Sequence, residues 1–418
     1  MERIVIAGGR PLKGSVRVTG AKNAALPILC ATLLTEEPCT IRGLPGLTDI
    51  DVMSEILRSL GAEVSVAGDA ITVQANSLTS QAVPDHLMRE MRSSIIVMGA
   101  LLTRFGRVRV SQPGGCAIGS RPIDLHLKGL KDLGAELVER HGYIQATCDR
   151  LQGTSIHLDY PSVGATENLM MAATLAQGQT TITNAAKEPE IVDLQNFLNV
   201  LGANVKGAGT ATIRIEGVEK LGGADYTIIP DRIVAGTYVL AGAATHGQVR
   251  VENVIPEHLE SLLAKLREIG IGVTAGDDFI EIDAAGPFRA IESVRTLPYP
   301  GFPTDLQAPM MALLCLAEGT SIVTETVFES RFKHVDELRR MGANIKVHER
   351  SAVIKGVSNL TGATVCATDL RAGAALVIAG LVADGITVIE DVRHIYRGYD
   401  RLEENLRALG ARIEGIGR

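Results

Sequence analysis

A helix-terminating motif recurs six times and constrains the fold more than any other feature of the chain. Its copies read RSLGAEV, KDLGAEL, NVLGANV, REIGIGV, RRMGANI and RALGARI, and they place glycines at Gly61, Gly134, Gly202, Gly270, Gly342 and Gly410. Glycine tolerates the positive φ of a helix C-cap, and the alternating residues that follow are typical of a strand. Because the spacing is nearly constant, the chain is predicted to be one unit repeated six times.

Each repeat also contains a helix that is apolar on all sides. These segments read NAALPILCATLL, SSIIVMGALL, ENLMMAATLA, IVAGTYVLAGAA, LQAPMMALLCLA and AGAALVIAGLVA. A helix without a polar face is expected to be buried on every side, whereas the helix before each glycine is amphipathic, as in DIDVMSEILRSL. Short strands such as CTIRGL connect the two helices. The predicted unit is helix, strand, helix, strand, strand.

Six such units predict an α/β fold, a two-lobed inside-out barrel with three repeats in each lobe. The last repeat lacks its final strand, and the N-terminal residues resemble that missing part in layout. We therefore expect one lobe at residues 22–229 and the other at residues 230–418 together with 1–21. Buried helices would form the centre of each lobe, sheets would lie outside them, and the cleft between the lobes would hold the ligand.

Composition excludes several classes of protein. A net charge of −7, 3% aromatic residues and no tryptophan argue against nucleic-acid binding. The start MERIVIAGGR lacks the features of a signal peptide, and no uncharged stretch is long enough to span a membrane, so a cytoplasmic location is predicted. The six cysteines form no C-x-x-C pair, and the nine histidines are scattered. No metal and no cofactor are therefore expected.

One cysteine lies in the loop QPGGCAIGSRPID, which is an insertion relative to the other repeats. Cys116 is close in sequence to Arg121, Lys128 and a predicted helix start, and such surroundings lower the pKa of a thiol. The thiol could then act as an acid or a nucleophile. The alternative is an incidental thiol in a turn.

Three aspartates occupy the same place in different repeats, at the start of a buried helix. They are Asp231, Asp305 and Asp369. A carboxylate there could be a general base, but it could also match the positive end of the helix dipole. The spacing does not decide between these roles.

Basic side chains also gather at predicted helix starts. Lys22 and Asn23 open the first buried helix, and Arg371 and Arg397 open the two helices of the sixth repeat. Helix N-termini and arginines both suit phosphate and carboxylate groups. In an otherwise acidic protein this pattern indicates a small polyanionic substrate.

The whole chain resembles the enolpyruvyl transferases, and within them the branch that acts on UDP-N-acetylglucosamine. The resemblance rests on GAKNAALP, PGGCAIGSRPIDLH, PSVGATEN, FPTDLQAP, ESRFKHVDEL, DLRAGAALV and RGYDRLEENLRALGA. It implies transfer of the enolpyruvyl group of phosphoenolpyruvate to the sugar 3-hydroxyl, with release of phosphate and without a metal. It also implies the first committed step of peptidoglycan biosynthesis and sensitivity to fosfomycin. From the composition we expect no nucleic-acid or membrane partner, and the sequence gives no sign of an obligate protein partner.

The resemblance further implies roles for individual residues. Cys116 would protonate the methylene carbon on a loop that closes as a lid, and Asp305 would take the hydroxyl proton. The implied catalytic residues are Cys116, Asp305, Lys22 and Arg397. The implied contacts of phosphoenolpyruvate are Lys22, Asn23, Arg121, Arg371 and Arg397. The implied contacts of the sugar nucleotide are Asn23, Arg92, Arg121, Pro122, Ile123, Asp124, Leu125, Ser162, Val163, Gly164, Asp305 and Val327.

Two positions depart from the pattern of some family members. Some members have a tryptophan shortly after the residue that matches Arg92 and a lysine just before SVG, whereas this chain has Ile96 and Tyr160 in those neighbourhoods. The resemblance therefore assigns no contact at either position.

Three alternatives remain open at this point. The shikimate-pathway enolpyruvyl transferase performs the same transfer on another hydroxyl, but the PGGCAIGSRP loop argues against it. A catalytically silent paralogue that binds the sugar nucleotide would have no chemical need for Cys116, Asp305, Lys22 and Arg397. A purely structural repeat protein would not need its differences concentrated in loops.

Overall fold

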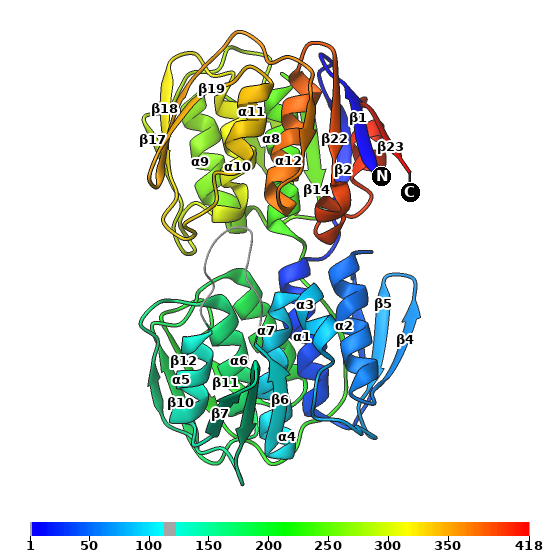
Figure 1. Ribbon diagram of the computed structural model, residues 1–418, viewed down its shortest axis with the longest axis vertical. Coiled ribbons are helices and arrows are strands. Elements are labelled where there is room, and N and C mark those ends of the chain that lie inside the picture. Colours follow the sequence, from blue (N-terminus) through cyan, green and yellow to red (C-terminus); the bar gives the residue numbers. More distant parts are fainter. Residues whose placement is uncertain (1, 113–122, 418) are drawn as a thin grey trace. The chain divides into compact units, whose positions relative to one another are not determined.

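The computed structural model describes residues 2–112 and 123–417. These residues form two compact units. The first lobe comprises residues 20–112 and 123–229, and the second lobe comprises residues 2–19 and 230–417 (Figure 1). Each lobe has its own hydrophobic core.

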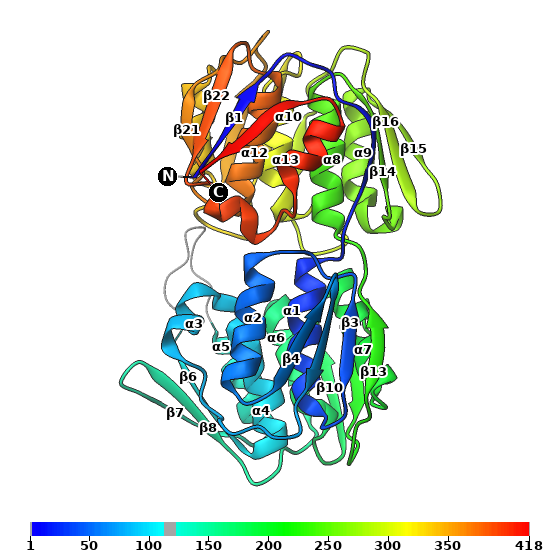
Figure 2. The same ribbon diagram turned by 90° about the vertical axis from the view of Figure 1, so that its right-hand side faces the viewer.

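Three apolar helices form the centre of each lobe, with the sheets outside them (Figures 1 and 2). In the first lobe they are α1 (Lys22–Ala31), α4 (Val97–Phe105) and α6 (Val163–Thr174). In the second lobe they are α8 (Arg232–Ala244), α10 (Gln307–Leu314) and α12 (Leu370–Val382). Every residue of α10 is buried, and every residue of α8 except Arg232 is buried. The prediction of helices buried on all sides is confirmed, and so is the inside-out α/β architecture.

The amphipathic helices lie where the motif predicts them. They are α2 (Thr48–Ser59), α5 (Asp124–Asp132), α7 (Pro189–Val200), α9 (Glu260–Ile269), α11 (His334–Arg340) and α13 (Leu402–Ala408). The six predicted capping glycines have φ between +94° and +103°. This left-handed conformation explains why glycine recurs at the end of each helix.

The remaining helical segments are short. They are α3 (Asp85–Glu90) and the 3₁₀ turns η1 (Thr32–Leu34), η2 (Arg92–Ile96), η3 (Pro256–Leu259), η4 (Thr304–Leu306) and η5 (Val392–Arg397). No helix in the described part of the chain is long and apolar enough to cross a membrane.

The described strands of the first lobe form three sheets. Their orders are β13-β3-β5-β4, β6-β8-β7 and β11-β12-β10-β9. The strands are β3 (Cys39–Arg42), β4 (Glu63–Ala67), β5 (Ala70–Gln74), β6 (Arg107–Ser111), β7 (Glu136–Arg140), β8 (Tyr143–Thr147), β9 (Ser155–His157), β10 (Gln179–Thr183), β11 (Asn204–Lys206), β12 (Thr212–Glu216) and β13 (Ala224–Thr227).

The described strands of the second lobe also form three sheets. Their orders are β21-β22-β1-β23, β15-β16-β14-β2 and β17-β18-β20-β19. The strands are β1 (Arg3–Ala7), β2 (Lys13–Arg17), β14 (Gln248–Glu252), β15 (Gly272–Ala275), β16 (Phe279–Asp283), β17 (Ser293–Arg295), β18 (Thr320–Thr324), β19 (Asn344–His348), β20 (Ser351–Lys355), β21 (Thr364–Cys366), β22 (Ile386–Glu390) and β23 (Arg412–Ile416).

The N-terminal strands belong to the lobe that contains the C-terminus. β1 lies between β22 and β23 and is antiparallel to both, while β2 pairs in parallel with β14. Ile4 and Ile6 alternate along β1 and are fully buried. In the first lobe, β13 pairs in parallel with β3 in the same way as β2 pairs with β14. Each lobe therefore joins its third repeat to its first through a parallel strand pair.

Candidate functional site

The second lobe brings one aspartate and two arginines together. Asp305 lies in η4, directly before α10, and its side chain is 25% exposed. Nη2 of Arg331 donates to Oδ1 of Asp305 at 2.7 Å, and Nη2 of Arg371 donates to Oδ2 at 2.9 Å. Both arginine side chains are only 4% exposed. These three residues form a largely buried charged cluster, in which two guanidiniums share one carboxylate.

The charge balance of this cluster determines the protonation of Asp305. Burial alone would raise the pKa of the carboxyl group, but the charges of Arg371 and Arg331 outweigh burial and hold it well below its usual range. Burial alone would lower the pKa of Arg371, but the negative charge of Asp305 outweighs burial and raises this pKa above its usual value. Asp305 is therefore ionised, but it is a weak base while both arginines are bound to it.

The structure separates the three aspartates that the sequence left equivalent. Oδ1 of Asp231 accepts hydrogen bonds from two backbone amides at the start of α8, at 2.8 and 3.0 Å. Oδ1 of Asp369 does the same at the start of α12, at 2.9 and 3.0 Å. Both are N-caps. The carboxylate oxygens of Asp305 accept hydrogen bonds from the guanidiniums of Arg331 and Arg371.

Two buried guanidinium donors of the cluster have no hydrogen-bond partner among the described residues. They are Nε of Arg331 and Nη1 of Arg371. Nε2 of the neighbouring His334 is also buried without a partner. Burial lowers the pKa of this imidazole to about 4; the Asp369 charge opposes this shift and the smaller effect of the Arg331 charge adds to it. Unsatisfied guanidinium donors can bind a carboxylate or a phosphate. Arg331 was not predicted as a site residue, although it lies in the segment ESRFKHVDEL.

In the first lobe, Lys22 is the first residue of α1 and is held by a carboxylate. Its Nζ lies 3.0 Å from Oδ2 of Asp49, in the first turn of α2, and the two side chains are 11% and 5% exposed. Asn23 follows and is half-buried. Asp49 was missed by the sequence analysis, because its position in an amphipathic helix suggests only a charge near a helix N-terminus.

Two predicted nucleotide-binding segments lie beside each other in the first lobe. Residues 123–125 begin α5, and residues 162–164 begin α6, where the Ser162 hydroxyl caps the helix. The imidazole of His126 lies directly against Gly164: a Cβ on that glycine would be 3.3 Å from Cε1. This contact joins the starts of the two helices.

The orientation of His126 is set by its neighbours. Oδ1 of Asn168 accepts the amide of Gly99 at 2.7 Å, which turns Nδ2 of Asn168 toward Nδ1 of His126 at 3.0 Å. Burial lowers the pKa of His126 to about 4, so the ring is neutral near pH 7. Because Nδ1 is an acceptor, the proton lies on Nε2.

The other predicted residues are reported in turn. Cys116, Arg121 and Pro122 lie outside the described residues, and so does the side chain of Arg92, the first residue of η2. Arg397 is half-buried at the end of η5, and Val327 is half-buried two residues beyond Glu325. Of the two departures from the family pattern, Ile96 is buried and Tyr160 is exposed.

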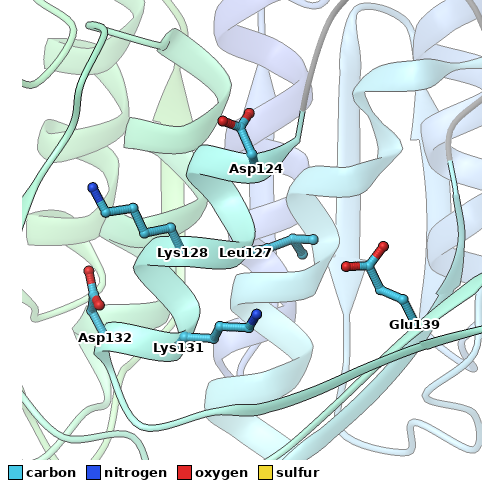
Figure 3. A pocket seen from close by; sticks show the side chains of 6 residues that line it. All are labelled: Asp124, Leu127, Lys128, Lys131, Asp132 and Glu139. Carbon is cyan, nitrogen blue, oxygen red and sulfur yellow. The ribbon is translucent and has the colours of Figure 1, made fainter.

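An open hollow of about 320 Å³ lies along α5. Figure 3 shows the side chains that line it: Asp124, Leu127, Lys128, Lys131, Asp132 and Glu139. Nζ of Lys128 is 3.1 Å from a carboxylate oxygen of Asp159. Acidic and basic groups are mixed in this hollow, so it favours an anion less than the Asp305 cluster does. No set of three histidine, cysteine or acidic side chains in the described ranges could hold a metal ion.

Comparison with known proteins identifies the family of the chain and agrees with this fold. The family model of EPSP synthase (3-phosphoshikimate 1-carboxyvinyltransferase) matches residues 6–406, and the chain belongs to this family of enolpyruvyl transferases. Among curated relatives, UDP-N-acetylglucosamine 1-carboxyvinyltransferase 2 of Carboxydothermus hydrogenoformans is 57% identical over 418 residues, which is the whole of both chains. The protein of the same name from Caldanaerobacter subterraneus is 57% identical over 416 residues, again covering both chains completely.

Solved structures give the same architecture. The enolpyruvyl transferase NikO from Streptomyces tendae is similar with a TM-score of 0.89 at 27% identity, covering 99% of this chain and 98% of NikO. EPSP synthase from Acinetobacter baumannii has a TM-score of 0.77 at 18% identity, with both chains fully covered. At that identity the second similarity concerns the fold alone.

Proposed function

We propose that the protein transfers the enolpyruvyl group of phosphoenolpyruvate to the 3-hydroxyl of UDP-N-acetylglucosamine and releases phosphate. The observation that carries this proposal is 57% identity, over the full length of both chains, to relatives named UDP-N-acetylglucosamine 1-carboxyvinyltransferase. The Asp305 cluster supports it, because it combines a carboxylate with guanidiniums that can bind an anionic substrate. The identity also favours this acceptor over shikimate 3-phosphate and argues against a silent paralogue.

In the proposed reaction the sugar oxygen bonds to C2 of phosphoenolpyruvate while Asp305 takes the hydroxyl proton. Cys116 donates a proton to C3, giving a tetrahedral intermediate. The bond from C2 to the phosphate oxygen then breaks, C3 loses a proton, and the enol ether and phosphate result. No redox step is needed, and positive charge placed beside the phosphate and carboxylate lowers the barrier.

The strength of the base depends on where Arg371 is bound. With both arginines paired to it, Asp305 holds its proton poorly. In our proposal the substrate carboxylate takes hydrogen bonds from Arg371 and Arg397, so Asp305 loses part of one counter-charge. Its pKa then rises and it becomes a better base. Binding of phosphoenolpyruvate would thus activate Asp305.

Anion binding is assigned to residues that are already oriented. Lys22, which Asp49 holds, would bind the phosphate together with Arg121 and Arg397. The starts of α5 and α6 would bind the nucleotide, with Asn23, Arg92 and Val327 near the sugar. A helix start offers free amide donors to a diphosphate.

We further propose that the reaction is the first committed step of peptidoglycan biosynthesis, that it takes place in the cytoplasm, and that fosfomycin alkylates Cys116. These assignments extend the names of the relatives and the identity of Cys116 in the loop of residues 112–124.

The decisive assay follows phosphate release from phosphoenolpyruvate with either of two acceptors. UDP-N-acetylglucosamine should support release, and shikimate 3-phosphate should not. Release with only the shikimate compound would move the protein to the other pathway, and release with neither would refute an enolpyruvyl transferase.

Cys116→Ala tests the proposed acid separately. The variant should lose turnover and fosfomycin labelling, the latter measured by intact-protein mass, while its free energy of unfolding changes by less than about 0.5 kcal/mol. Cys366, which is exposed, supplies a control: Cys366→Ala should keep both activity and labelling. A large loss of stability in Cys116→Ala would indicate a structural thiol.

A further inference from the structure

Glu325 follows β18 directly and is 1% exposed. Its Oε1 accepts hydrogen bonds from the Thr296 hydroxyl at 2.7 Å and from the amides of Val327 and Phe328 at 2.8 and 3.1 Å. Its Oε2 accepts from the Thr304 hydroxyl at 2.8 Å. One buried carboxylate therefore ties together the chain after β18 and the turn before α10.

The Thr304 contact leads to the proposed base. The Thr304 hydroxyl donates to Glu325 and accepts from Nη1 of Arg331 at 2.8 Å. Nη2 of the same guanidinium donates to Asp305 at 2.7 Å. Four side chains thus form a continuous hydrogen-bonded chain within the second lobe, from Glu325 to Asp305.

The other contacts lead to the proposed sugar site. Because Oε1 accepts both amides, the backbone at residues 327 and 328 is held in one turn. Val327 is the residue of this lobe, besides Asp305, that the family resemblance places near the sugar nucleotide. Glu325 therefore binds Thr304, which holds Arg331 beside Asp305, and it also binds the backbone amide of Val327.

We infer that Glu325 is a positioning residue for this reaction, acting on Asp305 through Thr304 and Arg331 and on the sugar nucleotide through the backbone of Val327. The inference rests on the function proposed above. Glu325 is too deeply buried to touch substrate, so its effect is indirect.

The buried arginines explain why a carboxylate suits position 325. Arg331 and Arg371 are both buried, and Asp305 supplies a single negative charge to the pair. When Arg371 turns to the substrate carboxylate, Arg331 must stay in place to keep Asp305 aligned. The Thr304 hydroxyl accepts a hydrogen bond from Nη1 of Arg331 and is itself held by Glu325. This acceptor restricts the Arg331 guanidinium to one orientation.

Two substitutions separate the contact of Glu325 with Thr304 from its contacts with the amides of Val327 and Phe328. Thr304→Val keeps the shape of the side chain but removes the hydroxyl between Glu325 and Arg331, while the amides of residues 327 and 328 keep their acceptor. Glu325→Gln removes the negative charge and replaces one oxygen by an NH₂ group, so either a donor at the Oε1 position faces this group or the Thr304 hydroxyl must turn and accept from it. Glu329→Gln is the matched control, because Glu329 lies four residues away, is exposed, and pairs with Arg350 at 3.7 Å.

We expect Thr304→Val to lower kcat about tenfold and to leave the KM for UDP-N-acetylglucosamine within about twofold, as loss of one hydrogen bond to a charged group implies. Thr304→Ser should recover most of that rate. Glu325→Gln should lower kcat by at least as much and raise that KM, whereas Glu329→Gln should match the parent. The kcat of the double variant Thr304→Val with Glu325→Gln should lie within about twofold of that of the worse single variant. Both substitutions interrupt the same hydrogen bond between Thr304 and Glu325, so their effects should not multiply.

A pH profile gives a readout that a purely structural residue would not change. Arg331 favours the ionised form of Asp305, so a looser contact raises the apparent pKa of the base and moves the acid limb of kcat to higher pH in Thr304→Val. Folded Thr304→Val and Glu325→Gln with parental kcat, KM and pH profile would overturn the inference, as would multiplicative losses in the double variant. A parent protein that releases phosphate with neither acceptor would refute the proposed function instead, and the catalytic half of this inference with it.

Discussion

Residues of the same type take different roles here because their surroundings differ. Asp231 and Asp369 accept backbone amides at helix starts, whereas Asp305 accepts two buried guanidiniums. A buried arginine is costly unless it is paired, so the carboxylate at position 305 stabilises the lobe as well as serving the proposed chemistry. The two contributions can be measured separately.

Substituting Asp305→Asn leaves Arg331 and Arg371 without a shared counter-charge. We expect the free energy of unfolding to fall by about 3 kcal/mol, and kcat to fall by at least about a hundredfold. Urea unfolding and phosphate release measure the two effects. Asp369→Asn is the control, because asparagine caps a helix as well as aspartate does and should cost less than about 1 kcal/mol. Equal destabilisation in the two variants would contradict the paired-charge account.

His126 should make the protein less stable in acid. Its pKa is about 4 in the folded protein, against about 6.5 for an unperturbed histidine. Below pH 6.5 the unfolded chain therefore binds a proton that the folded protein refuses, and the stability due to this residue is lost progressively as the pH falls toward 4.

Between pH 7 and pH 5 this loss amounts to about 2 kcal/mol. The difference in free energy of unfolding between the parent and His126→Gln should shrink by this amount on acidification, as measured by urea titration at both pH values. His86→Gln, the same substitution at an exposed site, is the control for the chemical change itself. A difference that is the same at both pH values would mean that His126 does not titrate in this way.

Among the elements, the six glycine caps are the clearest link between sequence and conformation. Gly202 has a φ of +102°, and a Cβ added there would touch nothing within 4 Å. Any cost of an alanine at this position therefore comes from the backbone and not from a clash. A left-handed conformation costs a residue with a Cβ about 1–2 kcal/mol.

Gly202→Ala should accordingly lower the free energy of unfolding by about 1 kcal/mol, with unchanged activity. Gly286→Ala is the comparison, because the φ of Gly286 is not positive and a Cβ there would also meet nothing within 4 Å. This variant should be neutral or slightly more stable, since alanine restricts the unfolded chain. Urea midpoints that rank the two variants in the opposite order would refute the argument.

On the scale of the whole molecule, the two lobes differ in how they are assembled from the chain. The first lobe is a single stretch closed by β13 on β3, whereas the second lobe needs β1 and β2 from the other end of the sequence. β1 lies between two strands, and both of its core isoleucines are fully buried. Without residues 1–19 the last sheet would lose its link between β22 and β23.

A fragment of residues 20–229 should therefore fold cooperatively alone, whereas residues 230–418 alone should not. Joining residues 1–19 behind residue 418 through a short glycine-serine linker should restore folding of the second fragment. Circular dichroism during urea unfolding, with NMR peak dispersion, distinguishes the cases. A well-folded 230–418 fragment would show that the N-terminal strands are dispensable.

The repeat, the buried helices, the glycine caps and the inside-out α/β architecture were all predictable from the sequence. These features depend on local preferences and on hydrophobic periodicity, and both are visible in a short window of residues. The family resemblance likewise came from contiguous motifs, which the comparisons confirm.

Only the tertiary structure decided which aspartate meets the arginines, that Arg331 and Asp49 support the predicted site residues, and that Glu325 joins Thr304 to the chain at Val327. Asp305 and Arg371 are 66 residues apart, and each belongs to a different repeat with the same local pattern. Equivalent positions in a repeat have equal local signals, so the sequence cannot rank them. Packing of the three central helices of the second lobe brings Asp305 and Arg371 within hydrogen-bonding distance. Which aspartate meets which arginine is therefore a property of the assembled lobe.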